Sequence, residues 1–261
     1  MITAMERFRI TLLLLATAMA TATFAQSEGG LLLGAEAEKK VNKQLSVGLT
    51  ADFRTRNNFK TVDRWSVGLT ADYKLTKWLK ADAGYKLLDS NFREKSEYYT
   101  SQAGNVKIKW RPSYWGLRHR FHLSLSASHK FSNNIKLSWR ERWQYTYRPE
   151  ATPDRYKLKL SDQTMTLDDD YVRDAKSNHQ LRSRFQISYD KKRALLTPFA
   201  NVEFYNSLGI EKIRYTVGTE VRLNKQHGLE LFYRFQDMKH VSESDYDPDM
   251  HYVGMTYKLE L

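Results

Sequence analysis

The sequence contains no cysteine among its 261 residues, so disulfide bridges, thiolate metal sites and cysteine nucleophiles are excluded. Proline is scarce, with five residues, and no apolar run reaches the roughly 20 residues that a membrane-spanning helix needs. The negative mean hydropathy also argues against a bundle of membrane helices. A disordered chain is excluded as well, because aromatic residues form 13% of the sequence and are spread along it.

The chain is basic, with 42 Lys and Arg against 30 Asp and Glu and a formal net charge of +12. Its basic residues alternate with apolar ones and do not form a continuous run, so no nucleic-acid partner is predicted. A glycine-rich phosphate loop is also missing from the sequence.

Residues 1–25 have the pattern of a secretory signal peptide. An apolar stretch runs from Ile10 to Ala20, and the small residues Thr23 and Ala25 suit cleavage before Gln26. The stretch is about half the length of a spanning helix, which favours a cleaved leader over a membrane anchor. We therefore predict an exported protein whose mature domain is residues 26–261.

Apolar and polar residues alternate with a period of two through most of this domain. The alternation is clearest in a near-duplicate pair, SVGLTADFR at 46–54 and SVGLTADYK at 66–74. Eight later segments continue it, so ten strands are predicted: 46–54, 66–74, 79–87, 121–129, 135–147, 181–189, 196–204, 213–223, 229–235 and 253–261. Their lengths suit strands that cross a bilayer at a tilt better than the shorter strands of soluble sheets.

The connections alternate between short turns and long polar loops, as in outer-membrane barrels. The long ones are 91–116, 148–178 and 238–249. An even count of ten strands would place both chain ends in the periplasm. An alternating segment at 31–37 could add an eleventh strand and place the N-terminus outside, and a strand within 106–110 could restore an even number. The predicted fold is an all-β, antiparallel transmembrane β-barrel of ten to twelve strands.

The polar face of these strands is predicted to line the barrel lumen. Its basic residues are Arg54, Arg64, Lys74, Lys80, Lys86, Arg120, Arg140, Arg142, Arg182, Arg184, Arg214, Arg222 and Arg234. Its acidic residues are Asp52, Asp72, Asp82, Glu203, Glu220 and Glu230. The excess of basic residues predicts a field that favours anions if the lumen is open. Equally, these side chains could interlock and fill it.

The apolar face ends in aromatic residues, as expected for girdles at the two membrane interfaces. Glu141 is the exception, because it falls among Leu137, Trp139 and Trp143 on the predicted lipid face. We expect a bulge or a register shift there. A secreted soluble β-sandwich would also alternate, and it remains the alternative fold.

Several stretches, including AEAEKKVNKQLSVGL, LRSRFQISYD and HYVGMTYKLEL, resemble the bacterial outer-membrane barrels grouped as domain of unknown function 2490. The resemblance spans nearly the whole mature chain and implies a barrel without a known activity. The last strand, 253–261, is also similar to the terminal signal read by the barrel-assembly machinery, although it ends in Leu where Phe is usual. Outer-membrane lipid and this machinery are therefore the expected partners.

His122 and Ser124 form an H-x-S pair similar to that of barrel phospholipases and lipid A deacylases. Two residues apart on a strand, they share one face and could be hydrogen-bonded. Those enzymes, however, need the pair on the lipid side, which Leu123 and Leu125 occupy here. A lipid hydrolase is kept only as the alternative, and we expect no enzyme.

No metal or cofactor is predicted. The acidic residues Asp168, Asp169 and Asp170 could offer oxygen ligands to Ca²⁺, but they lack the spacing of a calcium loop, so an ordinary solvated loop is preferred. The seven histidines show no zinc spacing. The sequence therefore predicts either a channel or binding barrel for small, anion-leaning solutes, or a structural barrel that interacts through its long loops.

Overall fold

The computed structural model describes residues 27–100, 106–159, 163–192, 194–239 and 247–261, and the predicted leader lies outside these residues. Eleven strands form a closed barrel: β1 (Ser27–Lys40), β2 (Leu45–Arg56), β3 (Thr61–Lys74), β4 (Leu79–Phe92), β7 (Tyr114–Lys130), β8 (Ile135–Arg148), β11 (Lys176–Tyr189), β12 (Leu196–Asn206), β13 (Ile210–Arg222), β14 (His227–Met238) and β15 (Asp249–Glu260). No helix of the described residues is long and apolar enough to cross a membrane.

The strands follow one another around the ring, and each pairs with its neighbours in antiparallel fashion except where the ring closes. There β1 pairs with β15 in parallel, with Leu31 opposite Val253 and Ala37 opposite Leu259. The segment at 31–37 is thus an eleventh strand, which lies within the predicted range of ten to twelve, and the argument for an even number of strands is wrong. Because β1 starts beside Asp249, its first residue, Ser27, lies at the opposite end of the barrel from the C-terminus. The expectation that both ends are periplasmic is therefore also wrong.

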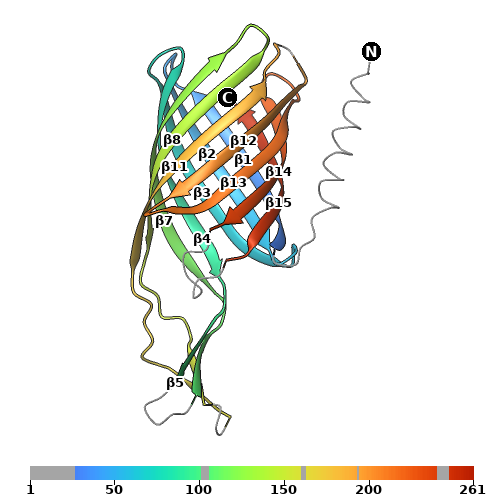
Figure 1. Ribbon diagram of the computed structural model, residues 1–261. Coiled ribbons are helices and arrows are strands. Elements are labelled where there is room, and N and C mark those ends of the chain that lie inside the picture. The colour runs from blue at the N-terminus through green and yellow to red at the C-terminus, as the bar shows by residue number, and fades with distance from the viewer. Residues whose placement is uncertain (1–26, 101–105, 160–162, 193, 240–246) are drawn as a thin grey trace.

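Short turns close one end of the barrel and long connections extend from the other (Figure 1). Asn134, in the turn between β7 and β8, has a φ of 67°, a conformation that asparagine tolerates. We refer below to the short-turn end and the long-loop end.

Two of the long connections fold together into a separate sheet beyond the long-loop end (Figure 1). This outer sheet has the order β10-β9-β6-β5 and consists of β5 (Lys95–Thr100), β6 (Val106–Arg111), β9 (Tyr156–Lys159) and β10 (Thr164–Leu167). The segment at 106–110 is therefore a strand, but it does not add to the barrel wall as one prediction had it.

The period-two pattern separates an outer wall from a lumen. On the outer wall Leu69 is 62% exposed and Leu123 57% exposed, whereas the inward-facing Ser66 is 2% exposed and His122 7% exposed. Apolar residues exposed on one side and polar residues buried on the other reverse the pattern of a water-soluble protein. This arrangement is that of a transmembrane barrel with a polar interior.

Glu141 lies on the outer wall in regular register, opposite Leu125 on β7 and Ser183 on β11. The predicted bulge is thus wrong. Instead, the carboxylate is held by donors on the same surface: Trp139 Nε1 donates to Oε1 at 2.9 Å and Ser183 Oγ donates to Oε2 at 2.9 Å. Two hydrogen bonds satisfy the charge without a change in backbone pairing.

Candidate functional site: the lumen

Two cavities occupy the lumen. The inner vestibule, of about 850 Å³, lies at the short-turn end, and the outer vestibule, of about 610 Å³, lies at the long-loop end. Three residues line both cavities: Arg120 on β7, Gln144 on β8 and Arg182 on β11. They form the layer at which the two vestibules meet.

An arginine and glutamate cluster lies at this layer. Glu203 accepts hydrogen bonds from Arg140 Nη2 at 2.6 Å, Arg182 Nη2 at 2.9 Å and the Tyr205 hydroxyl at 2.7 Å, and Arg214 in turn donates to the same hydroxyl. Glu203 is only 6% exposed. These residues come from β8, β11, β12 and β13, so the cluster ties four neighbouring strands together. Charge-assisted hydrogen bonds of this kind fix their partners in place.

A second cluster surrounds Asp82 in the inner vestibule. Asp82 Oδ1 accepts hydrogen bonds from Arg142 Nη2 at 3.0 Å and Ser124 Oγ at 2.9 Å, and His122 Nε2 lies 3.3 Å from the same atom. Ser124 Oγ also accepts a bond from Arg142 Nε at 2.7 Å. The serine thus bonds to aspartate and arginine, and not to the histidine. Nucleophilic catalysis needs the base bonded to the nucleophile.

The other acidic residues proposed from sequence each have a basic partner. Lys86 lies 2.5 Å from Asp52 and Lys80 lies 2.7 Å from Asp72. Near the short-turn end, Lys258 Nζ lies 2.5 Å from Glu220 and 2.6 Å from Glu230. The acidic residues of the lumen that the sequence analysis named are therefore each paired with a basic residue.

The basic residues exceed these acids. Arg184 lines the inner vestibule, Arg234 donates to Thr216 Oγ1 at 3.2 Å, and Arg222 lies beside a separate cavity of about 120 Å³ at the short-turn end. The structure thus brings Arg120, Arg140, Arg142, Arg182 and Arg214 near the meeting layer, and leaves Arg222 apart from it.

The outer vestibule carries most of the imbalance, since among the described residues only Asp63, Glu94 and Asp247 supply acid groups to its lining. Thirteen basic residues line it: Arg54, Arg56, Arg64, Arg93, Lys95, Arg111, Arg118, Arg120, Arg173, Lys176, Arg182, Lys212 and Arg214. A concave surface of one charge sign concentrates counter-ions of the other sign.

Several of these residues were missed by the sequence analysis. Arg118 and Lys212 precede the strand starts predicted at 121 and 213, although they share the inward face of Arg120 and Arg214. Extending the alternation by one inward position would have found both. Arg93, Arg111 and Arg173 come from the long connections, where no periodicity marks them.

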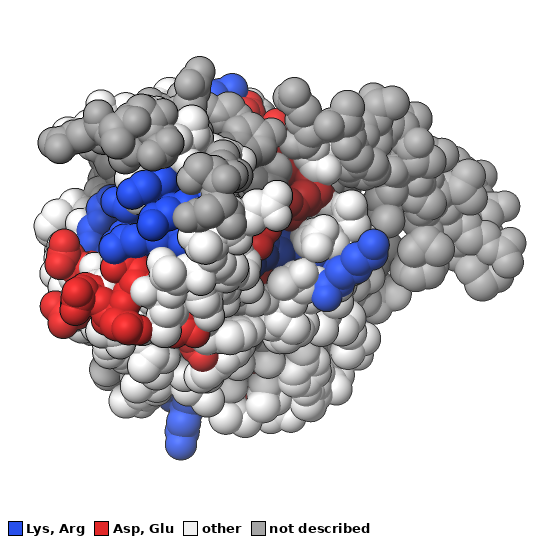
Figure 2. Space-filling model, turned by 90° about the horizontal axis from the view of Figure 1, so that it is seen from below, with Lys and Arg blue, Asp and Glu red and all other residues white. Residues whose placement is uncertain are grey.

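The outer sheet has one strongly basic face. Lys107 is directly opposite Lys159, and Lys109 is directly opposite Lys157. Seen from the long-loop end, basic side chains gather beside a group of acidic ones (Figure 2). Like charges opposite each other destabilise a sheet.

Asp168, next to the outer sheet, partly offsets this repulsion. Its carboxylate lies 2.8 Å from Lys157 Nζ and accepts a hydrogen bond of 2.7 Å from Arg155 Nε. The bond with Lys157, joined by that from Arg155, lowers the pKa of the Asp168 carboxyl from its ordinary value of 3.8. Asp168 is the buried member of the three aspartates considered for Ca²⁺, and its carboxylate is already taken by basic partners. In the described part of the chain, no cluster of metal-ligating residues occurs.

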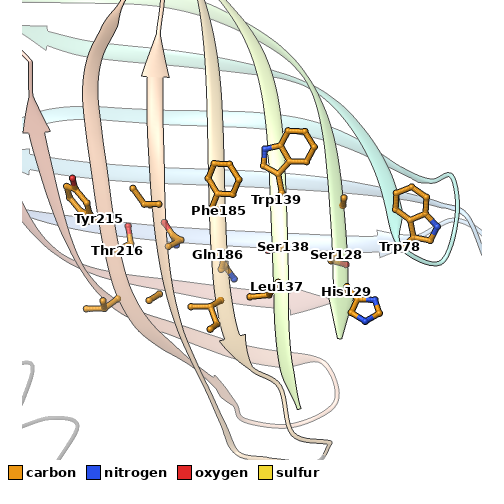
Figure 3. Close-up of a pocket in the computed structure, with 16 residues that line it drawn as sticks. Trp78, Ser128, His129, Leu137, Ser138, Trp139, Phe185, Gln186, Tyr215 and Thr216 are labelled. Carbon is orange, nitrogen blue, oxygen red and sulfur yellow. The ribbon is translucent and has the colours of Figure 1, made fainter. Parts of the chain in front are cut away.

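The most apolar groove lies on the outer wall and not in the lumen (Figure 3). It has a volume of about 800 Å³, and Leu137, Trp139, Phe185 and Ile187 on β8 and β11 contribute to its lining. The rings of Trp139 and Phe185 stack with centroids 6.3 Å apart. Such a surface offers contacts for hydrocarbon and few for a polar solute.

A closed ring of long strands, an apolar outer wall and a charged lumen define a transmembrane β-barrel of the outer-membrane class. The chain belongs to the family described as "Protein of unknown function (DUF2490)", whose model matches residues 29–247. This finding confirms the family resemblance, and the closed ring of eleven strands confirms the predicted fold.

Solved structures show a similar barrel at low sequence identity. The beta domain of the Bordetella autotransporter BrkA is 12% identical with a TM-score of 0.46, covering 75% of this chain and 76% of that chain. The CymD monoaromatic hydrocarbon channel is 13% identical with a TM-score of 0.37, covering 77% of this chain and 66% of that chain. No curated protein matches the sequence.

Proposed function

We propose that this protein is a narrow outer-membrane channel that favours small anions. The observation that carries the proposal is the lining of the outer vestibule, to which the described part of the chain contributes thirteen basic and three acidic residues. A solute entering from the long-loop end meets this positive field first, which raises the local concentration of anions and repels cations.

The proposed route passes the layer of Arg120, Gln144 and Arg182, where the two vestibules meet. Arg182 is held by Glu203, whereas Arg120 donates only to the neutral Thr146 Oγ1, at 3.2 Å. Arg120 therefore keeps a positive charge available to a passing anion. Rings of basic side chains select anions in this way.

Planar-bilayer recording of the refolded protein under a KCl gradient tests the proposal. The expected result is discrete current steps with a reversal potential that favours chloride over potassium. Arg120→Glu should shift the reversal potential toward potassium, whereas Lys191→Glu, in the exposed turn between β11 and β12, should leave it unchanged. Fully inserted barrels without current would contradict the proposal.

The proposed location is the bacterial outer membrane, after cleavage of the leader near Ala25 and insertion of β15 by the barrel-assembly machinery. The apolar outer wall and the leader sequence support it. Fractionation, together with mass spectrometry of the mature N-terminus, should find the protein in the outer membrane starting at Gln26. A product that stays dissolved without detergent would contradict this location.

A second candidate function, surface interaction through the outer sheet, has its own support. On the face opposite the lysines, Tyr98 is 72% exposed and Met165 50% exposed. Deleting the outer sheet should leave barrel folding intact and abolish such an interaction, and cell-surface binding assays with the deletion variant would measure it.

A further inference from the structure

Besides Arg111, Arg173 and Lys176, which come from or adjoin the long connections, five basic residues of the outer vestibule form no ion pair among the described residues. They are Arg64, Arg118, Arg120, Lys212 and Arg214. They come from β3, β7 and β13, and in the strand order β13 stands across the ring from β3. Their charges therefore face a common space from opposite walls.

The hydrogen bonds and ring contacts of these residues are with neutral groups. Arg214 Nε donates to Gln236 Oε1 at 2.9 Å, and Lys212 Nζ lies 4.6 Å from the ring centroid of Tyr205. Arg118 lies over the ring of Phe92 at 4.8 Å, and its Nε has no hydrogen-bond partner although the atom is buried. Buried donors without partners cost free energy until an acceptor arrives.

The kind of acceptor follows from the donors. A guanidinium group presents parallel N–H donors that match two oxygens of one phosphate, and several guanidinium groups can share one group of that shape. A single chloride neutralises one charge, whereas a solute with several phosphate groups can reach cations on opposite walls. The cavity, at about 610 Å³, lies within the usual range for a small-molecule site.

The mouth of the vestibule adds aromatic surface between arginines. Phe92 and Tyr114 stack with ring centroids 5.1 Å apart, and Arg173 lies over Phe92 at 4.4 Å. Arg111 lies over Tyr114 at 5.1 Å. These contacts hold further guanidinium groups at the entrance, where the charge of a solute is first met.

We propose that the outer vestibule is a binding site for small solutes that carry several phosphate groups. This proposal rests on the proposed function, since it names the class of anion that the channel admits, and it can be tested separately because binding does not require current.

The test uses the refolded, full mature barrel in detergent at low salt, with titration calorimetry and three probes: tripolyphosphate, inorganic phosphate and citrate. Tripolyphosphate should bind most tightly, at least about tenfold more tightly than citrate, because a terminal phosphate group offers three oxygens that several guanidinium groups can share, whereas a carboxylate offers two. Citrate carries several negative charges on planar carboxylates and so controls for charge alone. Equal affinity for citrate and tripolyphosphate would overturn the proposal, as would no binding of tripolyphosphate.

Variants place the site within the lumen. Arg118→Gln and Arg120→Gln should each weaken tripolyphosphate binding about tenfold, since each removes a cation without leaving a carboxylate unpaired. The matched control is Arg184→Gln, which removes an unpaired arginine from the inner vestibule and should change the affinity little. Heat-modifiable migration on gels shows that each variant is folded, and Arg118→Gln serves if Arg120→Gln does not fold. An equal loss in the control would overturn the location.

Bilayer recordings then separate the two proposals. Tripolyphosphate added at the long-loop side should block the chloride current of the native protein. Chloride-selective current without tripolyphosphate binding would refute the site and leave the channel standing, whereas binding without any current would refute the channel and leave the site standing.

Discussion

Ser183 on β11 donates a hydrogen bond of 2.9 Å to Glu141 on β8, on the outer wall of the barrel. Glu141 is about as far from the start of its strand as from the end, which places its charge near the middle of the wall. A charged group on a lipid-facing surface is destabilising, and most so at the bilayer midplane.

Glu141→Gln should therefore raise the free energy of unfolding by about 1 kcal/mol in lipid vesicles, because glutamine keeps an oxygen for Ser183 and loses the charge. Urea titration of the inserted barrel measures this. Ser183→Ala should act in the opposite direction, because it removes a donor from the carboxylate. A loss of stability in Glu141→Gln would show that the charge itself is needed.

Glu203→Gln should destabilise the barrel strongly. The substitution leaves Arg140 and Arg182, both largely buried, without their carboxylate, and breaking a buried ion pair costs about 3–5 kcal/mol. The matched control is Glu220→Gln, whose side chain is 50% exposed and whose partner Lys258 keeps a second carboxylate in Glu230, so less than about 1 kcal/mol should be lost. The temperature of the heat-modifiable gel shift compares the variants, and equal shifts would contradict the central role of Glu203.

Ser124→Ala should leave lipid hydrolysis unchanged at background level, because Ser124 Oγ bonds to Asp82 and Arg142 and faces the lumen. Losing these bonds should lower stability by about 1 kcal/mol. Fatty-acid release from outer-membrane lipids, measured for the native protein and the variant, provides the check. Release by the native protein alone would make the hydrolase hypothesis the better one.

Asp168→Asn should loosen the outer sheet at neutral pH. Because interactions with Lys157 and Arg155 lower the pKa of Asp168 in the folded state, its carboxylate stabilises the fold above the ordinary value of 3.8, and that stabilisation is lost as the pH falls through the lowered pKa. Hydrogen exchange of the β9 and β10 amides, corrected for intrinsic rates, should therefore be faster in the variant at neutral pH. The difference should vanish under strongly acidic conditions, and a difference that persists there would point to another cause.

The strands of the barrel wall were predictable because each side of the wall imposes its own chemistry on alternate residues. Eight of the ten segments lie within observed strands, and those at 213–223 and 253–261 each run one residue past the end of their strand. The observed strands β7 and β13 begin earlier than predicted, which explains why Arg118 and Lys212 were missed. The segment at 31–37 carries the same alternation, but its pairing with β15 brings together the two ends of the chain. Local sequence does not encode that pairing, so the argument for an even number of strands failed, although the observed eleven lie within the predicted ten to twelve.

The outer sheet was not predictable for a related reason. The segment at 106–110 has strand character, but its partners on β9 lie about fifty residues further along the chain. Pairing between two loops depends on where the barrel holds them. The error at Glu141 has another cause. The sequence analysis expected a backbone bulge to move this charge off the lipid face, whereas a hydrogen bond from Ser183 on the neighbouring strand satisfies the carboxylate in place.

The joint between β1 and β15 differs from every other joint in the wall, since both partners run the same way. Parallel pairing is slightly less stable per residue than antiparallel pairing. These two strands are also the first and last of the ring, so no turn ties them together. Under mechanical load the barrel should rupture along this seam, and pulling on either terminus should peel away a single strand before the remaining wall gives way.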